Sequence, residues 1–117
     1  MESFELAKKI IRILDEKKGE EIRLIRISEL TVLADYFIIV NGTSNTHVRA
    51  LAEEVEEETA KLGVTPRNIE GRSTGWILLD YGDVVVHVFT PQDREYYSLE
   101  RLWPDAAFLD TDDIVSE

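Results

Sequence analysis

The chain has 117 residues, with 24 acidic and 13 basic side chains, two histidines and no cysteine, which gives a formal net charge of −11. This length fits one domain, and the lack of cysteine excludes disulfides and thiolate metal sites. The acidic charge opposes direct nucleic-acid binding and favours a basic partner, and no stretch approaches the ~20 apolar residues of a membrane span. We therefore expect a soluble, cytoplasmic protein that needs no cofactor.

The N-terminal third predicts a helix, a strand and a packed connection. Apolar residues at helical spacing predict an amphipathic helix over 3–18, with Ser3 as its N-cap and Gly19 at its end. Residues 21–27 have the pattern of a strand with one partly solvated face. We expect the connection over 28–35 to pack onto the domain through its large apolar side chains, which are Leu30, Val32 and Leu33.

The middle of the chain predicts a buried strand followed by a long helix. Residues 36–40 form a short, continuous apolar run, which is typical of a central strand. Helical spacing returns over 45–62 with an acidic outer side, and Gly63 is the expected end of that helix. The segment 64–73 is irregular, with room for a short strand near 68–70.

The stretch 75–89 predicts a β-hairpin, because two apolar runs flank a polar break at which Gly82 can take the positive φ of a tight turn. Both arms are nearly all apolar, so we expect helices or other layers to cover both of their faces. Since side chains alternate along a strand, His87 shares a face with Val85 and Phe89.

The C-terminal part predicts a third helix and an acidic tail. The helix runs over 92–102 after Pro91, and its apolar positions are spaced to dock on the sheet through Tyr96, Tyr97, Leu99 and Leu102. Trp103 and Pro104 end it.

The tail over 105–117 has no base, and we expect it to be mobile unless Phe108 and Leu109 dock. Its acids are Asp105, Asp110, Asp112, Asp113 and Glu117. The domain itself is expected over 1–104. The order helix, strand, strand, helix, hairpin, helix predicts a single α/β domain in which helices flank one mixed β-sheet.

The Gly-Thr-Ser turn at 42–44 joins a buried strand to a helix, where backbone N–H groups can hold a phosphate. Nucleotidyltransferases have a Gly-Ser turn at this place, but they also need paired carboxylates on the next strands to hold divalent metal. Asp80 and Asp83 do not form such a pair, since they lie on either side of a turn. The simpler interpretation is an ordinary turn capped by Ser44 or Asn45.

The two histidines do not indicate catalysis or a metal site. His47 lies three residues after Ser44, close enough to act as a base, but no orienting acid is evident. We interpret it as a capping or packing residue. His87 lies in a strand of valines and is interpreted as a satisfied buried or interface histidine. The two are far apart in sequence and lack zinc-ligand spacing.

A set of aromatic and apolar side chains in the hairpin and last helix predicts a protein-binding face. Trp and Tyr are common interface anchors because they bury a large area and keep one polar group, and nearby acids complement a basic partner. A role in the core alone is the alternative for each ring. The set consists of Trp76, Leu78, Tyr97 and Trp103, beside Asp80 and Asp83.

At these residues the chain resembles the ribosomal silencing factor family, also called RsfS or Iojap-like proteins. The likeness runs in order over about residues 3–103, and the tail after Trp103 extends beyond it. The matching pieces are Asp35-Tyr36-Phe37-Ile38-Ile39, Gly42-Thr43-Ser44 with His47-Val48, Glu70-Gly71, Trp76-Ile77-Leu78-Leu79-Asp80, Gly82-Asp83-Val84-Val85-Val86-His87-Val88-Phe89, Arg94, Tyr97, Leu99-Glu100 and Leu102-Trp103.

The resemblance implies a fold related to nucleotidyltransferases but without their catalytic carboxylates. It also implies binding to the large ribosomal subunit through its ribosomal protein number fourteen. Bound there, a family member sterically blocks joining of the small subunit and represses translation when nutrients are scarce, without enzymatic activity. Relatives in mitochondria and chloroplasts act in large-subunit assembly, and members are often homodimers.

Two alternatives to silencing remain open, which are a nucleotide-binding protein or nucleotidyltransferase and a large-subunit assembly factor. For contact with the ribosomal protein, the candidate residues are Trp76, Leu78, Asp80, Asp83, His87, Tyr97 and Trp103.

Overall fold

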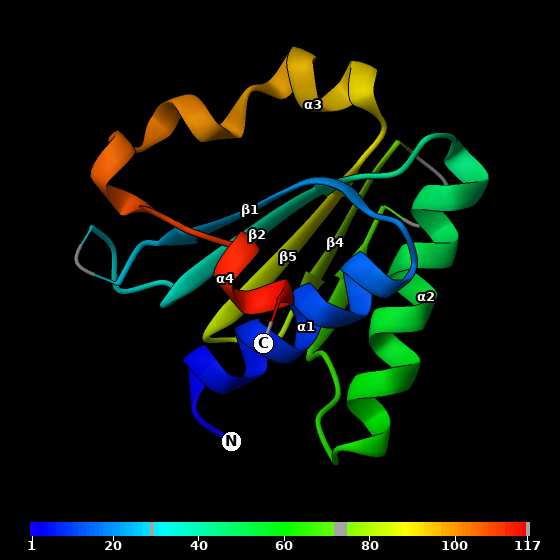
Figure 1. The fold of residues 1–117 in the computed structure, drawn as a ribbon, viewed down its shortest axis with the longest axis horizontal. Helices are drawn as coiled ribbons and strands as arrows, with labels where there is room; N and C mark the ends of the chain where they lie inside the picture. Colours follow the sequence, from blue (N-terminus) through cyan, green and yellow to red (C-terminus); the bar gives the residue numbers. More distant parts are fainter. Residues whose placement is uncertain (29, 72–74, 117) are drawn as a thin grey trace.

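In the computed structural model, a six-stranded sheet lies between a layer of helices and a C-terminal segment that arches over its other face (Figure 1). The structure describes residues 1–28, 30–71 and 75–116. The expectations for 28–35 and 64–73 fall partly on residues outside these ranges, and the acid Glu117 lies wholly outside them. Within the described residues, no helix is long and apolar enough to cross a bilayer.

The helices and strands follow the predicted order as far as Phe89. They are α1 (Ser3–Glu16), β1 (Glu20–Arg26), β2 (Tyr36–Asn41), α2 (Asn45–Lys61), β3 (Asn68–Glu70), β4 (Trp76–Asp80) and β5 (Val84–Phe89). After Phe89 come α3 (Pro91–Tyr97), the 3₁₀ turns η1 (Leu99–Leu102) and η2 (Asp105–Ala107), β6 (Phe108–Leu109) and α4 (Asp112–Val115).

The sheet has the strand order β3-β4-β5-β2-β1-β6. Strands β2 and β5 are parallel, and every other neighbouring pair is antiparallel. The mixed sheet and the α/β class are therefore confirmed. The turn of the β4–β5 hairpin contains Gly82 at φ +90°, a conformation that glycine adopts without strain, and this prediction is also confirmed.

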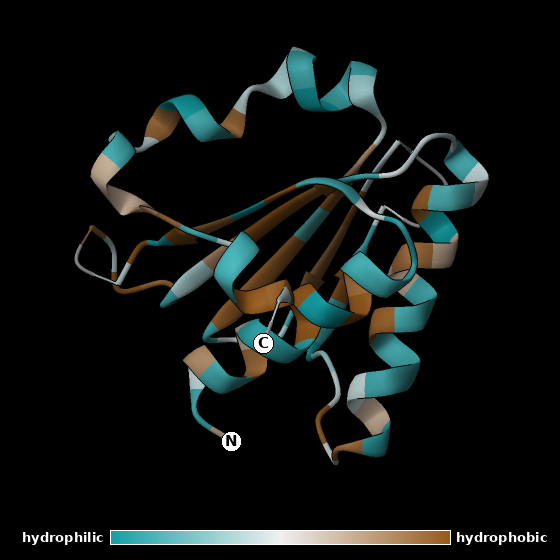
Figure 2. Ribbon diagram, in the orientation of Figure 1, coloured by the Kyte–Doolittle hydropathy of each residue, from teal (hydrophilic) through white to brown (hydrophobic). Residues whose placement is uncertain are grey.

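Alternation along the strands divides the core into two clusters, one on each side of the sheet. Hydrophobic residues are concentrated in the central strands, while the helices carry both hydrophobic and hydrophilic residues (Figure 2). We name the side under α1, α2 and α4 the helix face, and it carries the larger, mainly aliphatic cluster. The opposite side is the strap face, named after the strap over 91–107 that covers it. Its buried members are Ile25, Ile27, Ala34, Ile39, Val85, Phe89 and Ala107. Packed against them are the partly buried Phe37, Trp76, Leu78, Leu99, Trp103 and Phe108.

The structure corrects two predictions about the first half of the chain. Ser3 is the first residue of α1 and not its cap, which is Glu2 without a side-chain hydrogen bond. The prediction that the connection packs down through Leu30, Val32 and Leu33 is wrong, because all three are exposed, Leu33 to 80%. The Ile27 carbonyl accepts a hydrogen bond from the Leu30 amide, which closes a turn. The connection projects past the end of the strands (Figure 1).

Two predictions about the second half also need correction. Strand β4 is buried on one side only, since its burial alternates, whereas β5 is buried throughout as expected. The last helix ends at Tyr97, because Ser98 takes a left-handed φ of +48°. This break changes the helical spacing, so Tyr96 and Leu102 do not dock and are 81% and 71% exposed.

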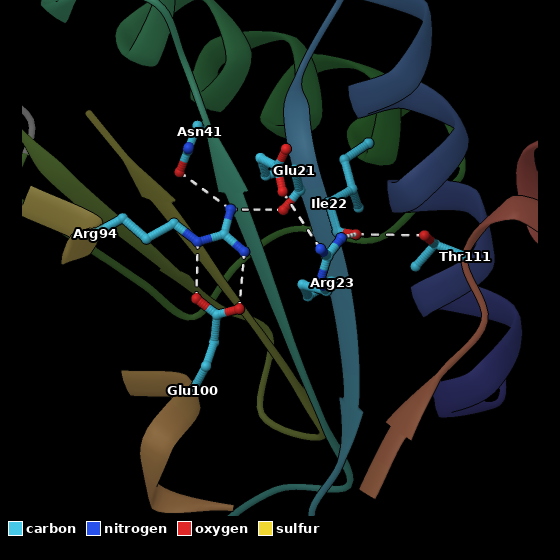
Figure 3. A network of polar contacts seen from close by, with 7 residues as sticks. All are labelled: Glu21, Ile22, Arg23, Asn41, Arg94, Glu100 and Thr111. Carbon is cyan, nitrogen blue, oxygen red and sulfur yellow. Dashed lines mark hydrogen bonds and ion pairs between the residues drawn. The ribbon is translucent and has the colours of Figure 1, made fainter. Parts of the chain in front are cut away.

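The tail packs against the N-terminal half of the domain. Phe108 and Leu109 form β6 and pair with β1, which meets the docking condition stated for the tail. Thr111 Oγ1 donates to the Ile22 carbonyl at 3.3 Å (Figure 3), and Ile114 is buried in the helix-face cluster. The boundary at residue 104 stays a prediction.

Candidate functional site on the strap face

Five of the seven candidate residues meet between the sheet and the strap. Trp76 and Leu78 project from β4 and His87 from β5, while Tyr97 and Trp103 come down from the strap. The Trp76 ring lies 4.5 Å from that of Tyr97 and 5.8 Å from that of His87, measured between centroids. The docking of Tyr97 is thus confirmed, and the site is a cluster of rings on one sheet face.

Sequence reasoning did not include Phe37 in this cluster. Its ring lies 4.7 Å from His87 and 5.2 Å from Trp103, so it links the strand to the far end of the strap. The signal was available, because Phe37 and Ile39 alternate with the helix-face residues of β2.

His87 is the most deeply buried polar member of the cluster, with 4% of its surface exposed. Its Nδ1 accepts a hydrogen bond from Trp76 Nε1 at 3.1 Å. Nε2 is buried and has no hydrogen-bond partner among the residues that the structure describes. Burial lowers the pKa of His87 from 6.5 to about 4, so the ring is neutral near pH 7. The interpretation as a buried histidine is confirmed, but only one of its two nitrogens is satisfied.

The two acidic candidates lie at the turn between β4 and β5. The Asp80 carboxylate pairs with Arg67 at 3.2 Å and also accepts from the Gly82 amide at 2.7 Å. Asp83 is exposed, and its backbone carbonyl accepts from the amides at the start of β2. Both residues therefore serve the local structure, and the Asp83 side chain is exposed to solvent.

A local signal starts the strap where β5 ends. Thr90 caps α3 and accepts from the Asp93 amide at 3.3 Å, and Pro91 follows at the first helical position. Gly75 lies beside this helix start, and a Cβ there would come within 2.9 Å of Thr90 Oγ1. Glycine at this point leaves room for the side chains of Thr90 and Asp93, which any larger residue would push aside.

A partly buried arginine fastens the strap to the sheet (Figure 3). Arg94 is 10% exposed and binds Glu100 through two parallel hydrogen bonds of 2.8 and 3.0 Å. Its Nη1 also donates to Asn41 Oδ1 at 3.1 Å and to the backbone carbonyl of Glu21. The hydrogen bond from Arg94 lowers the pKa of Glu100, so the pair is fully charged near neutral pH.

A bulge in β1 lies at Glu21, whose backbone carbonyl accepts a hydrogen bond from this arginine. The register of β1 against β2 shifts between Glu20 and Arg23, and Glu21 takes a left-handed φ of +54°. We name the contacts of Arg94 with Glu100, Asn41 and Glu21 the clamp. They hold α3 and η1 of the strap against the ends of β1 and β2.

The Gly-Thr-Ser turn before α2 uses its own polar groups. Ser44 caps the helix and accepts from the His47 amide at 3.1 Å, which confirms the simpler interpretation of the turn. His47 Nδ1 accepts from the Thr43 amide at 2.8 Å, and its Nε2 lies 3.0 Å from the Lys17 carbonyl oxygen. The Gly42 amide donates to Phe89. Of the two roles predicted for His47, capping or packing, the capping role is therefore confirmed.

The residues that the structure describes contain no group of three or more acids and histidines placed to hold a metal ion. The strap face presents large aromatic rings, most of them partly exposed to solvent, near the exposed carboxylate of Asp83. Large, partly exposed rings of this kind are typical of protein-binding surfaces.

A family model described as ribosomal silencing factor during starvation matches residues 1–117. The chain belongs to the ribosomal silencing factor family. The match includes the acidic tail, which lies beyond the motifs that carry the resemblance. Ribosomal silencing factor RsfS of Halalkalibacterium halodurans is 35% identical over 117 residues, which cover 99% of this chain and 100% of that protein.

Two further relatives describe the breadth of the family. A crystal structure of a Chromobacterium violaceum protein has a TM-score of 0.85 and 41% identity, covering 88% of this chain and 87% of that one. A mouse protein named mitochondrial assembly of ribosomal large subunit protein 1 is 30% identical over 105 residues. The match covers 86% of this chain and 46% of the mouse protein.

Proposed function

We propose that this protein is a non-enzymatic translation repressor that binds the large ribosomal subunit. It docks on ribosomal protein number fourteen and blocks joining of the small subunit when nutrients are scarce. Membership of the silencing family carries this proposal. The family name supplies the ribosome, and the resemblance described above supplies the ribosomal protein and the blocking mechanism.

The strap face is the proposed docking surface. Trp76 and Trp103 are partly exposed, and Tyr97 is 48% exposed, so three large rings already lie at the surface of the folded chain. Interface hot spots are rich in Trp and Tyr, and ribosomal proteins that contact RNA are commonly basic. The net charge of −11 favours such a partner and disfavours the RNA around it.

The mechanism requires bulk and position, not a reaction. A standard interface buries about 800 Å² on each partner, which the strap face and its rim can supply. The bound domain extends 34 × 33 × 29 Å along its principal axes. A rigid body of this size on the subunit-joining surface excludes the small subunit sterically.

Co-sedimentation tests the function. Purified protein is centrifuged with isolated large subunits, isolated small subunits and joined ribosomes at moderate salt. We expect it in the large-subunit pellet alone, and we expect fewer joined particles when it is added before mixing the subunits. Its absence from every ribosomal fraction would remove the family-based function and favour the nucleotide-binding alternative.

Large-subunit assembly is the second candidate, because the mouse relative is named for that process. Both roles use the same docking, so binding alone does not separate them. A silencing factor binds mature large subunits and lowers subunit joining without changing precursor levels. An assembly factor leaves immature large subunits to accumulate when it is depleted, which gradient profiles of depleted cells would reveal.

A further inference from the structure

The imidazole of His87 carries a hydrogen-bond donor that the folded chain does not use. The indole of Trp76 can only donate, so His87 Nδ1, 3.1 Å away, must be the acceptor. In the neutral ring the proton is then on Nε2. That N–H is buried without a partner among the described residues.

An unpaired buried donor is unusual, because most buried polar groups are hydrogen-bonded and leaving one unpaired destabilises the fold. Around the ring lie Phe37 and Phe89, with centroids 4.7 and 6.2 Å away, and Leu78 is its neighbour across the strands. These side chains have no acceptor to offer.

The donor lies on the side of the ring from which a partner would approach. His87 lies on the strap face of β5, where its ring contacts that of Trp76, and Nε2 is farther from Cβ than Nδ1 is, at the outer part of the ring. The cover there is thin, because Trp76, Leu78 and Trp103 are only partly buried. Neither α3 nor η1 contributes a fully buried side chain.

We infer that a basic protein partner completes this site by placing a backbone carbonyl oxygen against His87 Nε2–H when it docks on the strap face. Side chains of the strap shift to admit it. The inference rests on the proposed function and adds the chemistry of recognition to it. A carbonyl is neutral, so it can accept this hydrogen bond inside an acidic surface, whereas a phosphate or carboxylate is repelled by the chain's charge of −11.

Nuclear magnetic resonance tests the contact without any mutation. The full chain is labelled with ¹⁵N, and isolated ribosomal protein number fourteen of the large subunit is added at neutral pH. The free protein should show the Nε2–H tautomer of His87. In the complex, the Nε2–H proton should move downfield and exchange more slowly with water. A complex that leaves this signal unchanged would overturn the inference while keeping the proposed function.

Two substitutions at the same position give a matched comparison. His87→Asn keeps an oxygen acceptor near Nδ1 for Trp76 and removes the distal donor, whereas His87→Gln places an amide donor near Nε2. We expect His87→Asn to bind isolated large subunits about tenfold more weakly, the effect of losing one buried hydrogen bond. His87→Gln should stay within about threefold of the wild type.

The other outcomes are equally informative. Equal affinity of His87→Asn and the wild type would contradict the inference, and so would binding to ribosomal RNA without the ribosomal protein. If the wild type binds no ribosomal particle, the proposed function itself fails, which is a separate result from a failure of the His87 contact. Melting temperatures of both variants exclude loss of folding as the cause of weaker binding.

Discussion

The two faces of the sheet differ in chemistry and in how completely they are covered. On the helix face, aliphatic residues such as Ile10, Leu14 and Leu51 are fully buried. On the strap face, several large aromatic rings remain partly exposed, and a buried histidine has a donor without a partner among the described residues. The helix face is packed for stability, while the strap face, which we propose as the docking surface, is less completely covered.

The largest expected effect comes from equal truncations on the two faces. Leu51→Ala should lower the free energy of unfolding by about 3–4 kcal/mol, because a fully buried side chain leaves a cavity. Leu78→Ala should lower the free energy of unfolding by only about 1 kcal/mol, because its side chain is partly exposed. It should nevertheless weaken binding to large subunits more than Leu51→Ala does. Urea denaturation measures the free energy of unfolding of each variant, and co-sedimentation measures its affinity for large subunits. Equal stability losses would remove the distinction between the faces.

The pH dependence of stability tests the burial of His87 on the strap face. Burial lowers the pKa of His87 to about 4 in the folded chain, against 6.5 for the unfolded one. Between these values the unfolded chain binds more protons, so the free energy of unfolding should fall by about 3 kcal/mol as the pH drops from 6.5 to 4. Well above pH 6.5 the ring is neutral in both states, so His87 causes no loss of stability there. The part of the slope that disappears in His87→Asn belongs to His87, and an identical slope in that variant would contradict the assignment.

The clamp should fix the strap more than it stabilises the domain. Arg94→Met removes hydrogen bonds to Glu100, Asn41 and Glu21, and we expect a loss of about 2 kcal/mol. Hydrogen exchange should increase in α3 and η1 while the strands stay protected. Arg101→Met is the matched control, because Arg101 is an exposed arginine of the same strap and should change stability by under about 0.5 kcal/mol. Equal exchange in the two variants would show that the clamp does not hold the strap.

The smallest expected effect is that of ATP with magnesium. Ser44 and His47 already accept hydrogen bonds within the turn before α2, and the Gly42 amide donates to Phe89. Because these groups of the turn are already hydrogen-bonded, we expect ATP with magnesium to shift the melting temperature by less than about 1 °C. The melting temperature reports binding, since a ligand that binds the folded chain raises it by mass action. A clear, concentration-dependent rise would revive the nucleotide-binding alternative.

The sequence was sufficient for the elements whose signals are local. The hairpin around Gly82, the helix capped by Ser44 and the shared face of His87 and Phe89 follow from periodicity and turn chemistry. The strap did not follow, because its course depends on Ser98 leaving the helical conformation, which no spacing reveals.

Tertiary partners explain the remaining differences. Arg94 and Glu100 are six residues apart and face each other only after the break at Ser98, and the Glu21 carbonyl is available only because β1 bulges. The exposed side chain of Leu33 has the composition of a core residue but lies past the end of the sheet, where no layer covers it. Such placements depend on the assembled fold and not on a local pattern.

Binding of two aromatic variants to isolated large subunits tests the central claim most directly. Trp76→Ala truncates a ring on the strap face, and Phe4→Ala truncates a ring on α1, which packs near Tyr36 on the helix side. With both variants shown to be folded, we expect Trp76→Ala to lose at least about tenfold in affinity and Phe4→Ala to bind like the wild type. Wild-type affinity for Trp76→Ala, or a larger loss for Phe4→Ala, would contradict the placement of the binding site on the strap face.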